Sequence, residues 1–438
     1  MDTERRLQLT APTDCPELDG SGPQAAAAFT ARAEPVQAPS SSEEVLLRPL
    51  QKRNVVQELP KRARGLGIYE TRVGNQTVPM LRTMMTTVCD KACGYCPFGR
   101  TRDFRRSSWR PEELADTVLK LREAGMIQGL FLTSGLATAP RRIMDRMLAT
   151  VDILRARGFQ DYVHLKMLPG ADTGQVAEAM RLATRVSVNL EAPTPEVLRR
   201  LAPEKDLGSD LAVHVRTTSD LAARFPQHAP RGGVVTQFVV GPGGETDRTL
   251  MDAASRLYRR WGVRRVYYSG FIPVMGTPME GVLPTPPIRE ARLYQADWLL
   301  RFYGYRMDEL PFDPRGMLPE GVDPKAAFAL AHPDLFPVEV NRAPRELLLR
   351  VPGLGPQSVT RILQHRRAQP LRAPSDLKRL GAVVSRAQDF LLFDGKHFPA
   401  PRPVAPAEQL RLFDQSLTFG RMLGDGRRIV PQHGGTYV

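Results

Sequence analysis

One stretch of the sequence decides the fold, and it reads Met85-Thr-Thr-Val-Cys89-Asp-Lys-Ala-Cys93-Gly-Tyr-Cys96-Pro-Phe-Gly99. It holds three of the four cysteines in the chain. The β-branched residues before the first cysteine predict a buried strand that delivers the cysteine loop to one end of a sheet. Soft thiolates this close together either form a disulfide or bind a soft metal ion. The loop is therefore the first candidate for chemistry in this chain.

Three kinds of cysteine site can be compared at this loop. A disulfide is the weaker interpretation, because an odd number leaves one thiol over and no signal peptide precedes the loop. A structural zinc site is also weak, since it needs four ligands and no further His or Cys follows at zinc-finger spacing. An iron–sulfur cube is usually held by four thiolates, so three thiolates leave one iron open to another ligand. Cys15 is expected to be a bystander, and it remains open as a distant fourth ligand.

Short apolar strands alternate with amphipathic helices from about residue 77 to 275. We expect strands over 81–88, 129–133, 162–167, 185–190, 236–240 and 264–269. We expect helices over 111–123, 140–157, 174–184, 194–201 and 246–261. This alternation predicts an α/β fold with a parallel sheet covered by helices. About six such units suit a partial (β/α)6 barrel, and a doubly wound open sheet is the alternative.

Polar residues and glycines gather where the predicted strands end, which is where parallel barrels place their functional groups. The candidates at these strand ends are Ser134, Gly135, His164, Lys166, Ser187, Asn189, Glu191, Gly241 and Glu245. The spacing of two between Ser187, Asn189 and Glu191 predicts three side chains on one face of a strand, where they would face a ligand. His164 and Lys166 are expected to be structural. The segment from Gly241 to Glu245 is equally consistent with a flexible turn before a capped helix.

Composition and charge limit the class of protein. A chain of 438 residues predicts two or three domains. No apolar run approaches the roughly 18 residues of a membrane span and the first residues lack a signal-peptide pattern, so we expect a cytoplasmic protein. The net charge of +14 favours a polyanionic partner over a neutral metabolite. Residues 1–60 show poor periodicity and are expected to form a disordered or loosely attached arm.

A second informative stretch, Val351-Pro-Gly-Leu-Gly355-Pro, lies near the C-terminus. Asn341 is predicted to cap a helix over 343–350, and Pro356 suits the first turn of a second helix. A glycine-rich turn between two helices lets backbone N–H groups approach a phosphate at a helix N-terminus. The candidates for contact with nucleic acid are Gly353, Leu354, Gly355, Ser358 and Arg361. Two more short helices are expected over 375–379 and 384–392, and a packing or protein-contact module is the alternative.

The spacing C-x3-C-x2-C, with Tyr95 just before the third cysteine, resembles the cluster loop of the radical S-adenosylmethionine (SAM) superfamily. The resemblance implies a partial TIM-like barrel, a [4Fe-4S] cluster on Cys89, Cys93 and Cys96, and SAM on the open iron as the source of a 5′-deoxyadenosyl radical. It also implies a cofactor site that includes Tyr95, with Ser134 and Gly135 for the methionine amino group, Ser187, Asn189 and Glu191 for the ribose and carboxylate, and Gly241 and Glu245 beside the adenine. The family's usual Glu after the second strand is missing here, so Ser134 or a backbone carbonyl would have to serve.

The glycine-rich turn resembles the helix-hairpin-helix DNA-binding motif. Together with the cysteine loop and the segments 185–193, 201–206, 265–269, 293–304 and 341–345, it resembles a bacterial family of radical SAM proteins named for DNA modification or repair, whose genes tend to accompany a uracil-DNA glycosylase-like protein. The resemblance covers about residues 60–395. It implies DNA bound through its backbone, an electron donor such as flavodoxin or ferredoxin, and a uracil-DNA glycosylase-like partner.

Two other functional classes stay open at this point: a DNA-binding protein with a structural or redox-sensing cluster, and a radical enzyme for a small metabolite. The sequence predicts five parts of the chain, which are the arm 1–60, the radical SAM core 61–280, a helical and Pro-rich connector 281–338, a small all-α helix-hairpin-helix module 339–395, and a tail 396–438.

Overall fold

A computed structural model describes residue 3 and residues 67–73 and 76–400 of the chain. The predicted arm, all but the first residues of the predicted tail, and Cys15 lie outside the described residues. Of the helices within the described part, none is both long and apolar enough to cross a membrane.

The large sheet has seven strands that follow one another in sequence order. They are β1 (Ile68–Val73), β2 (Gln76–Met84), β3 (Gly129–Thr133), β4 (Tyr162–Lys166), β5 (Arg185–Ser187), β6 (Val234–Val240) and β7 (Arg265–Gly270). The first pair is antiparallel, and the six strands from β2 to β7 are parallel. A doubly wound sheet reverses its strand order at a switch point. This order does not reverse, so the partial six-unit barrel is confirmed and the doubly wound alternative is wrong.

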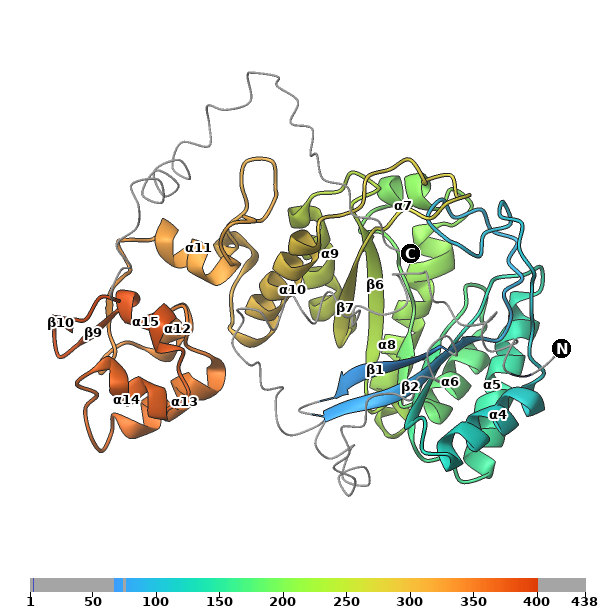
Figure 1. Ribbon diagram of the computed structural model, residues 1–438, viewed down its shortest axis with the longest axis horizontal. Coiled ribbons are helices and arrows are strands. Elements are labelled where there is room, and N and C mark those ends of the chain that lie inside the picture. Colours follow the sequence, from blue (N-terminus) through green and yellow to red (C-terminus); the bar gives the residue numbers. More distant parts are fainter. Residues whose placement is uncertain (1–2, 4–66, 74–75, 401–438) are drawn as a thin grey trace, which may run out of the picture.

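Helices cover one side of this sheet, as Figure 1 shows for the units that run from α4 to α8. The helices between the strands are α4 (Pro111–Glu123), α5 (Pro140–Ala156), α6 (Thr173–Leu182), α7 (Pro195–Leu201), α8 (Val213–Arg224) and α9 (Asp247–Trp261). Right-handed crossovers between neighbouring parallel strands place every helix on the same face. Successive side chains of a strand then alternate between the two faces. On β3, Leu130 and Leu132 belong to the main core, whereas Phe131 belongs to a small cluster on the other face with Val78 and Met80.

The last strand of the large sheet, β7, has its outer edge bonded to side chains. The backbone N–H of Val266 donates to the hydroxyl of Tyr258 at 3.0 Å, and that of Tyr268 donates to the hydroxyl of Tyr294 at 3.0 Å. The third N–H, at Gly270, donates to the carboxylate of Glu290 at 2.8 Å. Tyr294 and Glu290 belong to α10 (Pro287–Phe302), which packs beside β7. These side chains end the sheet, and the barrel stays open at this side.

The C-terminal part lies at one end of the molecule, beyond α10 and the connector helix α11 (Pro324–Ala331) in Figure 1. Its elements are β8 (Val338–Glu339), α12 (Arg345–Leu348), α13 (Pro356–His365), α14 (Pro374–Arg379), α15 (Val384–Ala387), β9 (Leu391–Phe393) and β10 (Lys396–His397). The last two strands and β8 form a three-stranded sheet. The prediction of an all-α module is therefore wrong. The helix expected over 384–392 is one turn of α-helix, α15, followed by a 3-10 turn, η6 (Gln388–Phe390), and its last two residues belong to the central strand, β9.

Two short helical hairpins in this part contact each other reciprocally. The first joins α12 to α13 through Gly353, and the second joins α14 to α15 through Gly381; both glycines have a positive φ. A Cβ on Gly353 would stand 2.4 Å from the carbonyl oxygen of Val383 in the second hairpin. Conversely, the carbonyl of Gly381 accepts a bond from the hydroxyl of Ser358 in the first hairpin, at 2.8 Å. Each turn thus packs on the other hairpin.

The predicted cap residue Asn341 has a different role. It lies four residues before α12, and Pro344 occupies the cap position instead. Its amide group exchanges two hydrogen bonds with the backbone of Leu371, at 2.9 and 2.8 Å, and so ties β8 to the segment before α14. The prediction of a helix cap was wrong because it considered only the local sequence, whereas the amide bonds 30 residues away.

Ion pairs hold the C-terminal part against the connector. Arg350 binds Glu309 through two hydrogen bonds of 2.8 Å, and both side chains are largely buried. Arg386 pairs with Asp323 at the start of α11. The buried residue Lys325 donates its ammonium to a backbone carbonyl of the first hairpin. The hydrophobic core also runs without a break from the barrel helices into this region.

Candidate functional site

The cysteine loop leaves β2 and continues beside the end of β3. The N–H of Gly135 donates to the carbonyl of Thr86 at 2.8 Å, and the N–H of Asp90 donates to that of Leu136 at 2.8 Å. The two backbones are so close that a Cβ on Gly135 would lie 2.3 Å from the carbonyl oxygen of Val88. Only glycine fits here, so Gly135 positions the cysteine loop through its backbone. Its predicted partner Ser134 makes only a long bond of 3.4 Å to Thr86.

One arginine that the sequence analysis did not select organises the rest of the loop. The guanidinium of Arg106 donates to four backbone carbonyls: Thr87 at 2.7 Å, Phe98 at 2.7 Å, Gly99 at 2.8 Å and Arg102 at 3.0 Å. These carbonyls lie on both sides of the three cysteines in the sequence. A single side chain therefore gathers the two ends of the loop. No local pattern signals this role, because the carbonyls are backbone groups that any sequence has.

The same guanidinium lies near two of the thiols. Burial lowers the pKa of Arg106, and the neighbouring Cys89 and Cys96 oppose that effect. The thiolate is the form of cysteine that binds metal, and this cation would lie beside its charge. The third thiol, Cys93, is buried, and the other two are partly exposed.

All three cysteines line one cavity, which has about 770 Å³ of empty space including space open to solvent. Five of the residues that the resemblance assigns to the cofactor site line it as well: Tyr95, Ser134, Gly135, Asn189 and Glu191. The structure thus brings residues from three strand ends to the cysteine loop, as the partial barrel predicts.

The segment after β5 supplies Asn189 and Glu191, but it is not a continuous strand. Strand β5 ends at Ser187, and Glu191 has a φ of 62°, in the left-handed region that non-glycine residues rarely adopt. The expectation of three side chains in simple alternation along one strand is therefore wrong. Both residues still reach the cavity. Backbone strain of this kind concentrates at ligand sites.

Glu191 and Lys205 place two charged side chains on the wall of the cavity. One carboxylate oxygen of Glu191 lies 3.6 Å from the ammonium of Lys205, and the other is buried with no hydrogen-bond partner in the described protein. The cavity wall also includes Leu211, from the π-helix η3 (Leu207–Ala212) that follows Lys205. π-Helical turns often occur at functional sites. Lys205 was not selected as a site residue, although its segment, 201–206, is among those that carry the family resemblance.

Two residues that were expected to be structural lie at the inner side of this wall. Lys166, at the end of β4, lines the cavity beside the cysteines. His164 lies one step deeper on the same face of the strand, outside this cavity. Ser187, the third residue of the predicted trio, is also deeper, and it shares a second cavity with His164 and Asn189.

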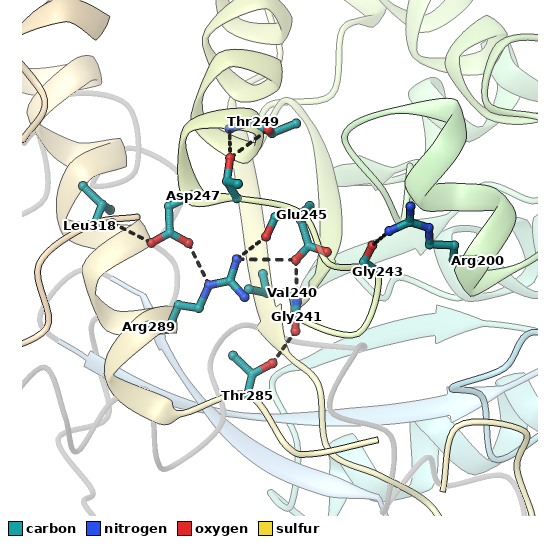
Figure 2. Close-up of polar contacts among 11 residues, drawn as sticks. Arg200, Val240, Gly241, Gly243, Glu245, Asp247, Thr249, Thr285, Arg289 and Leu318 are labelled. Carbon is teal, nitrogen blue, oxygen red and sulfur yellow. Dashed lines mark hydrogen bonds and ion pairs between the residues drawn. The ribbon is translucent and has the colours of Figure 1, made fainter. Parts of the chain in front are cut away.

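The structure places Gly241 and Glu245 in a separate polar cluster, outside the residues that line the cysteine cavity. Figure 2 shows this cluster at the end of β6. The N–H of Gly241 donates to the carboxylate of Glu245, which closes the loop. Arg289 then joins the loop to α9, because it donates to Asp247 at 2.7 Å and to the backbone of Glu245 at 2.7 Å.

Burial is the main influence on the buried carboxyl of this loop. It raises the pKa of Glu245, and the bond from Gly241 and the charge of Arg289 act in the opposite direction. Gly241 has a φ of 109°, and a Cβ there would meet Thr285 at 2.1 Å. The glycine is thus required by backbone conformation and by close packing. The pattern of a glycine and a glutamate four residues apart reflects this internal bond.

Of the predicted nucleic-acid residues, three face inward. Gly353, Leu354 and Ser358 are buried, and the carbonyl of Leu354 accepts the ammonium of Lys325. The remaining two reach the surface: Gly355 caps α13 and Arg361 is exposed.

The turn at the start of α13 has a simple geometry. Gly355 has a φ of −94°, so it needs no left-handed backbone; that requirement falls on Gly353, at +83°. In the described part of the chain, the N–H groups of Gly355, Gln357 and Ser358 donate to no protein acceptor. Arg361 is one turn further along the helix, and its guanidinium lies against the turn of the second hairpin.

The cysteine cavity fits a cluster and its cofactor by its donor chemistry. Within the described residues, no three His, Cys, Asp or Glu side chains are grouped to share one metal ion. An iron–sulfur cube binds each thiolate to a different iron, so thiols spread around a cavity suit it. Arg106 nearby and Lys91 and Lys205 on the wall place positive charge around the thiolates. The cofactor would be held next to them by Asn189, Glu191 and Lys205.

Comparison with known proteins agrees with this chemistry. Residues 83–257 match the family model described as the Radical SAM superfamily. No curated protein matches the chain.

Two solved structures are similar over half of this chain. One is the FeFe-hydrogenase maturase HydG from Carboxydothermus hydrogenoformans, at 14% identity and a TM-score of 0.40, and the other is methylornithine synthase (PylB), at 18% identity and a TM-score of 0.40. The match covers 51% of the maturase and 61% of the synthase, so this chain corresponds to about half of the length of each.

Proposed function

We propose that this chain, a radical SAM enzyme whose cofactors are a [4Fe-4S] cluster and S-adenosylmethionine, modifies or repairs DNA or another nucleic acid. The cofactors, when bound, supply a 5′-deoxyadenosyl radical, and the protein supplies position and exclusion of water. Arg106 fixes the cysteine loop, and Asn189, Glu191 and Lys205 would orient the cofactor. The proposal concerns the substrate, which we infer to be a nucleic acid.

The observation that carries the nucleic-acid substrate is the first turn of α13 in the C-terminal hairpins. Three unbonded N–H groups, at Gly355, Gln357 and Ser358, start a ten-residue helix. Such an N-terminus attracts phosphate through the N–H groups and the helix dipole. Exposed Arg361 is one turn away. Backbone amides and arginine are the groups that contact phosphates without reading sequence.

The charge of the surrounding surface supports the same partner. Exposed basic side chains extend across the hairpins at Arg345, Arg367, Arg372, Lys378 and Arg379. Exposed cations of this kind bind a polyanion with an affinity that falls steeply as salt rises. The whole chain carries a net charge of +14.

Attachment of the hairpins to the connector supports a coupling between binding and chemistry. The pairs Arg350–Glu309 and Arg386–Asp323 hold the hairpins in one orientation relative to α10 and α11. A strand bound at the hairpins would therefore keep a fixed direction relative to the barrel. The hairpins would thereby hold a long substrate while one of its nucleotides reaches the cofactor.

The first experiment measures 5′-deoxyadenosine from reconstituted, reduced protein under anaerobic conditions with SAM, with and without single- and double-stranded DNA and RNA. We expect one of these nucleic acids to raise the yield several-fold. Cys93→Ala should abolish the product, and Cys15→Ala should not. A yield that no nucleic acid changes would contradict the proposal.

The second experiment isolates the hairpin. Arg361→Ala should weaken nucleic-acid binding about five- to tenfold at low salt, with a smaller loss at high salt, because one cation–phosphate contact is removed. The matched control is Arg216→Ala, which removes the same charge from an exposed position on α8. Equal effects of the two variants in an anisotropy titration would show that only net charge matters.

A further inference from the structure

The loop between β7 and α10, residues 272–284, is here called the rim loop, and Figure 1 shows it crossing the upper end of the barrel near α7. A backbone hydrogen bond closes its base, because the N–H of Thr285 donates to the carbonyl of Phe271 at 2.8 Å. Its far end is fixed to the cysteine loop, since the N–H of Met279 donates to the carbonyl of Gly94 at 3.0 Å. The rim loop therefore lies beside the loop whose three cysteines line the cofactor cavity.

The rim loop exposes an unusual amount of apolar surface. Four of the nine large apolar side chains that are exposed in the described residues belong to it: Ile272, Met275, Val282 and Leu283. Leu283 is 85% exposed and Met275 is 84% exposed. A fifth, Val88, precedes the first cysteine in the neighbouring loop. Apolar side chains that gather on one part of a surface mark a site of interaction with a partner.

The conformation of the rim loop keeps these side chains in solvent. Proline fixes the backbone dihedral φ, and the loop contains three prolines: Pro273, Pro278 and Pro284. The carboxylate of Glu280 accepts the N–H of Gly276 at 2.7 Å, which closes a turn inside the loop. A loop with these restraints presents its exposed apolar side chains at the surface before any partner binds.

Positive charge surrounds this apolar surface. The neighbouring segment 88–106 contains five cations and two acids. Arg105 is exposed. Arg102 lies against the rim loop, because a Cβ on Gly276 would stand 3.4 Å from its Nε. Apolar side chains framed by cations fit a partner that carries apolar faces next to negative charges. A nucleic-acid strand has this composition, since each base lies beside a phosphate.

We propose that Leu283 and Met275 form a wedge that inserts between neighbouring bases of a bound strand and opens their stack at the rim of the barrel. This inference rests on the proposed function, which supplies the strand. Exposed Leu, Met and Ile side chains of other proteins open base steps in this way. An enzyme that modifies one base within a duplex has to take it out of the stack. The wedge acts next to the cysteine loop, where the displaced nucleotide can approach the cofactor.

The emission of 2-aminopurine tests the wedge, because this base analogue fluoresces weakly when it is stacked and strongly when it is not. The full chain, with its cofactors reconstituted, is added to single- and double-stranded DNA and RNA oligonucleotides that carry the analogue at successive positions. We expect the emission to rise several-fold at one position. Leu283→Ala and Met275→Ala should each remove more than half of that rise. Both should keep the wild-type melting temperature, since the two side chains are exposed.

A matched control and a second measurement make the test specific. Leu330→Ala removes a leucine that is 57% exposed on α11, and it should leave the rise in emission unchanged. Leu283→Trp places an indole in the wedge, where stacking on a base should quench its emission when an oligonucleotide is added. Leu330→Trp should show no such quenching. Anisotropy titrations measure the affinity of every variant for the same oligonucleotides.

The outcomes separate this inference from the proposed function. Oligonucleotides that bind, but whose 2-aminopurine emission is the same with the wild type and both alanine variants of the wedge, would overturn the wedge and leave the proposed function intact. A wild type that binds no nucleic acid would reject the proposed function and the wedge with it. Quenching of Leu283→Trp by flavodoxin or by phosphatidylglycerol vesicles, and by no oligonucleotide, would assign the rim loop to another partner and overturn the inference.

Discussion

The inside of the half barrel and the C-terminal hairpins differ in whether their buried polar side-chain atoms have hydrogen-bond partners. In the barrel, His164, Ser187 and Gln237 each keep a buried polar atom without a partner. In the hairpins, within the described residues up to 400, every buried side-chain nitrogen and oxygen has one. Ser358, for example, donates to Gly381. The protein itself thus leaves several polar atoms of the barrel interior unbonded, whereas it bonds every such side-chain atom of the described hairpins.

This difference explains how each region would bind. The buried polar atoms of the hairpins are already hydrogen-bonded, so only exposed arginines and helix amides are left for contact with a partner. Binding at the hairpins would therefore depend mainly on the charge of the partner. In the barrel interior, each unbonded polar atom raises the free energy of the folded state, and a bound group with matching donors and acceptors would lower it again. Binding there would therefore depend on which donors and acceptors the bound group carries. The predictions below test the difference, and they run from the largest expected effect to the smallest.

The largest effect should follow Gly353→Val in the hairpins. The new Cβ would stand 2.4 Å from the carbonyl of Val383, and a β-branched residue at a φ of +83° is strained. Strain and overpacking together predict a loss of about 4 kcal/mol in the free energy of unfolding of this region. Gly395→Ala is the control, because it has a φ of +75° but open space around it. Urea unfolding should give about 1 kcal/mol for the control; equal losses would show that the contact with Val383 is unimportant.

A somewhat smaller effect should follow Arg106→Leu in the cysteine loop. Four backbone carbonyls would lose a charged donor, which predicts about 3 kcal/mol of destabilisation, mostly local to the loop. Iron per chain after anaerobic reconstitution, and its rate of loss to a chelator, measure the result. Arg105→Leu is the control, since its side chain is exposed. Iron retention as in the wild type would mean that the loop holds its shape without Arg106.

The third prediction concerns pH. Burial raises the pKa of Glu290, at the edge of β7, to about 7. The folded protein therefore holds this proton more tightly than the unfolded chain does, and the contribution is stabilising below about pH 4.5. It is lost as the pH rises from about 4.5 through 7, and the full loss is about 3 kcal/mol. Glu290→Gln keeps an acceptor for Gly270 without the titration. The stability of the variant relative to wild type should rise between pH 4.5 and 8; a constant difference would contradict the raised pKa.

The smallest effect is a contrast between two serines. Ser358→Ala breaks the bond to Gly381 and leaves its buried neighbour Gly353 untouched, so it should cost about 1 kcal/mol. Ser187→Ala removes a hydroxyl that has no partner and should cost almost nothing in the absence of ligand. Denaturant midpoints of the two variants, measured without cofactor or nucleic acid, give the comparison. Equal losses in the free energy of unfolding would show that the Ser187 hydroxyl is as well hydrogen-bonded as that of Ser358.

Much of the fold follows from the sequence because it depends on local periodicity. The six parallel strands and five of the helices between them repeat a pattern of short apolar runs and amphipathic stretches, and the structure has them in that order, with one further helix, α8, that was not expected. The cysteine loop, Asn189 and Glu191 were found because strand ends in such a barrel meet at one rim. Their meeting in one cavity needs only the topology.

What could not be predicted depends on contacts between distant residues. Arg106 and Lys205 contact groups whose distance along the sequence follows no recognisable pattern. Asn341 forms hydrogen bonds with the backbone of Leu371 instead of capping a helix. The strand β9 was missed because it is defined by its partners β8 and β10, and a run of three apolar residues also suits a helix. Gln237 did carry a signal: it is an amide in an otherwise largely apolar buried strand, which is the mark of an inward polar group.

The edge of strand β7 has a consequence for association between copies of the protein. A bare sheet edge is a template on which a strand of another molecule can add, and it is a common start of aggregation. Here Tyr258, Tyr294 and Glu290 already occupy the three outward N–H groups. A second chain would have to displace a phenol or a carboxylate for every bond that it gained. The edge of β7 is therefore protected against strand exchange between copies of the protein.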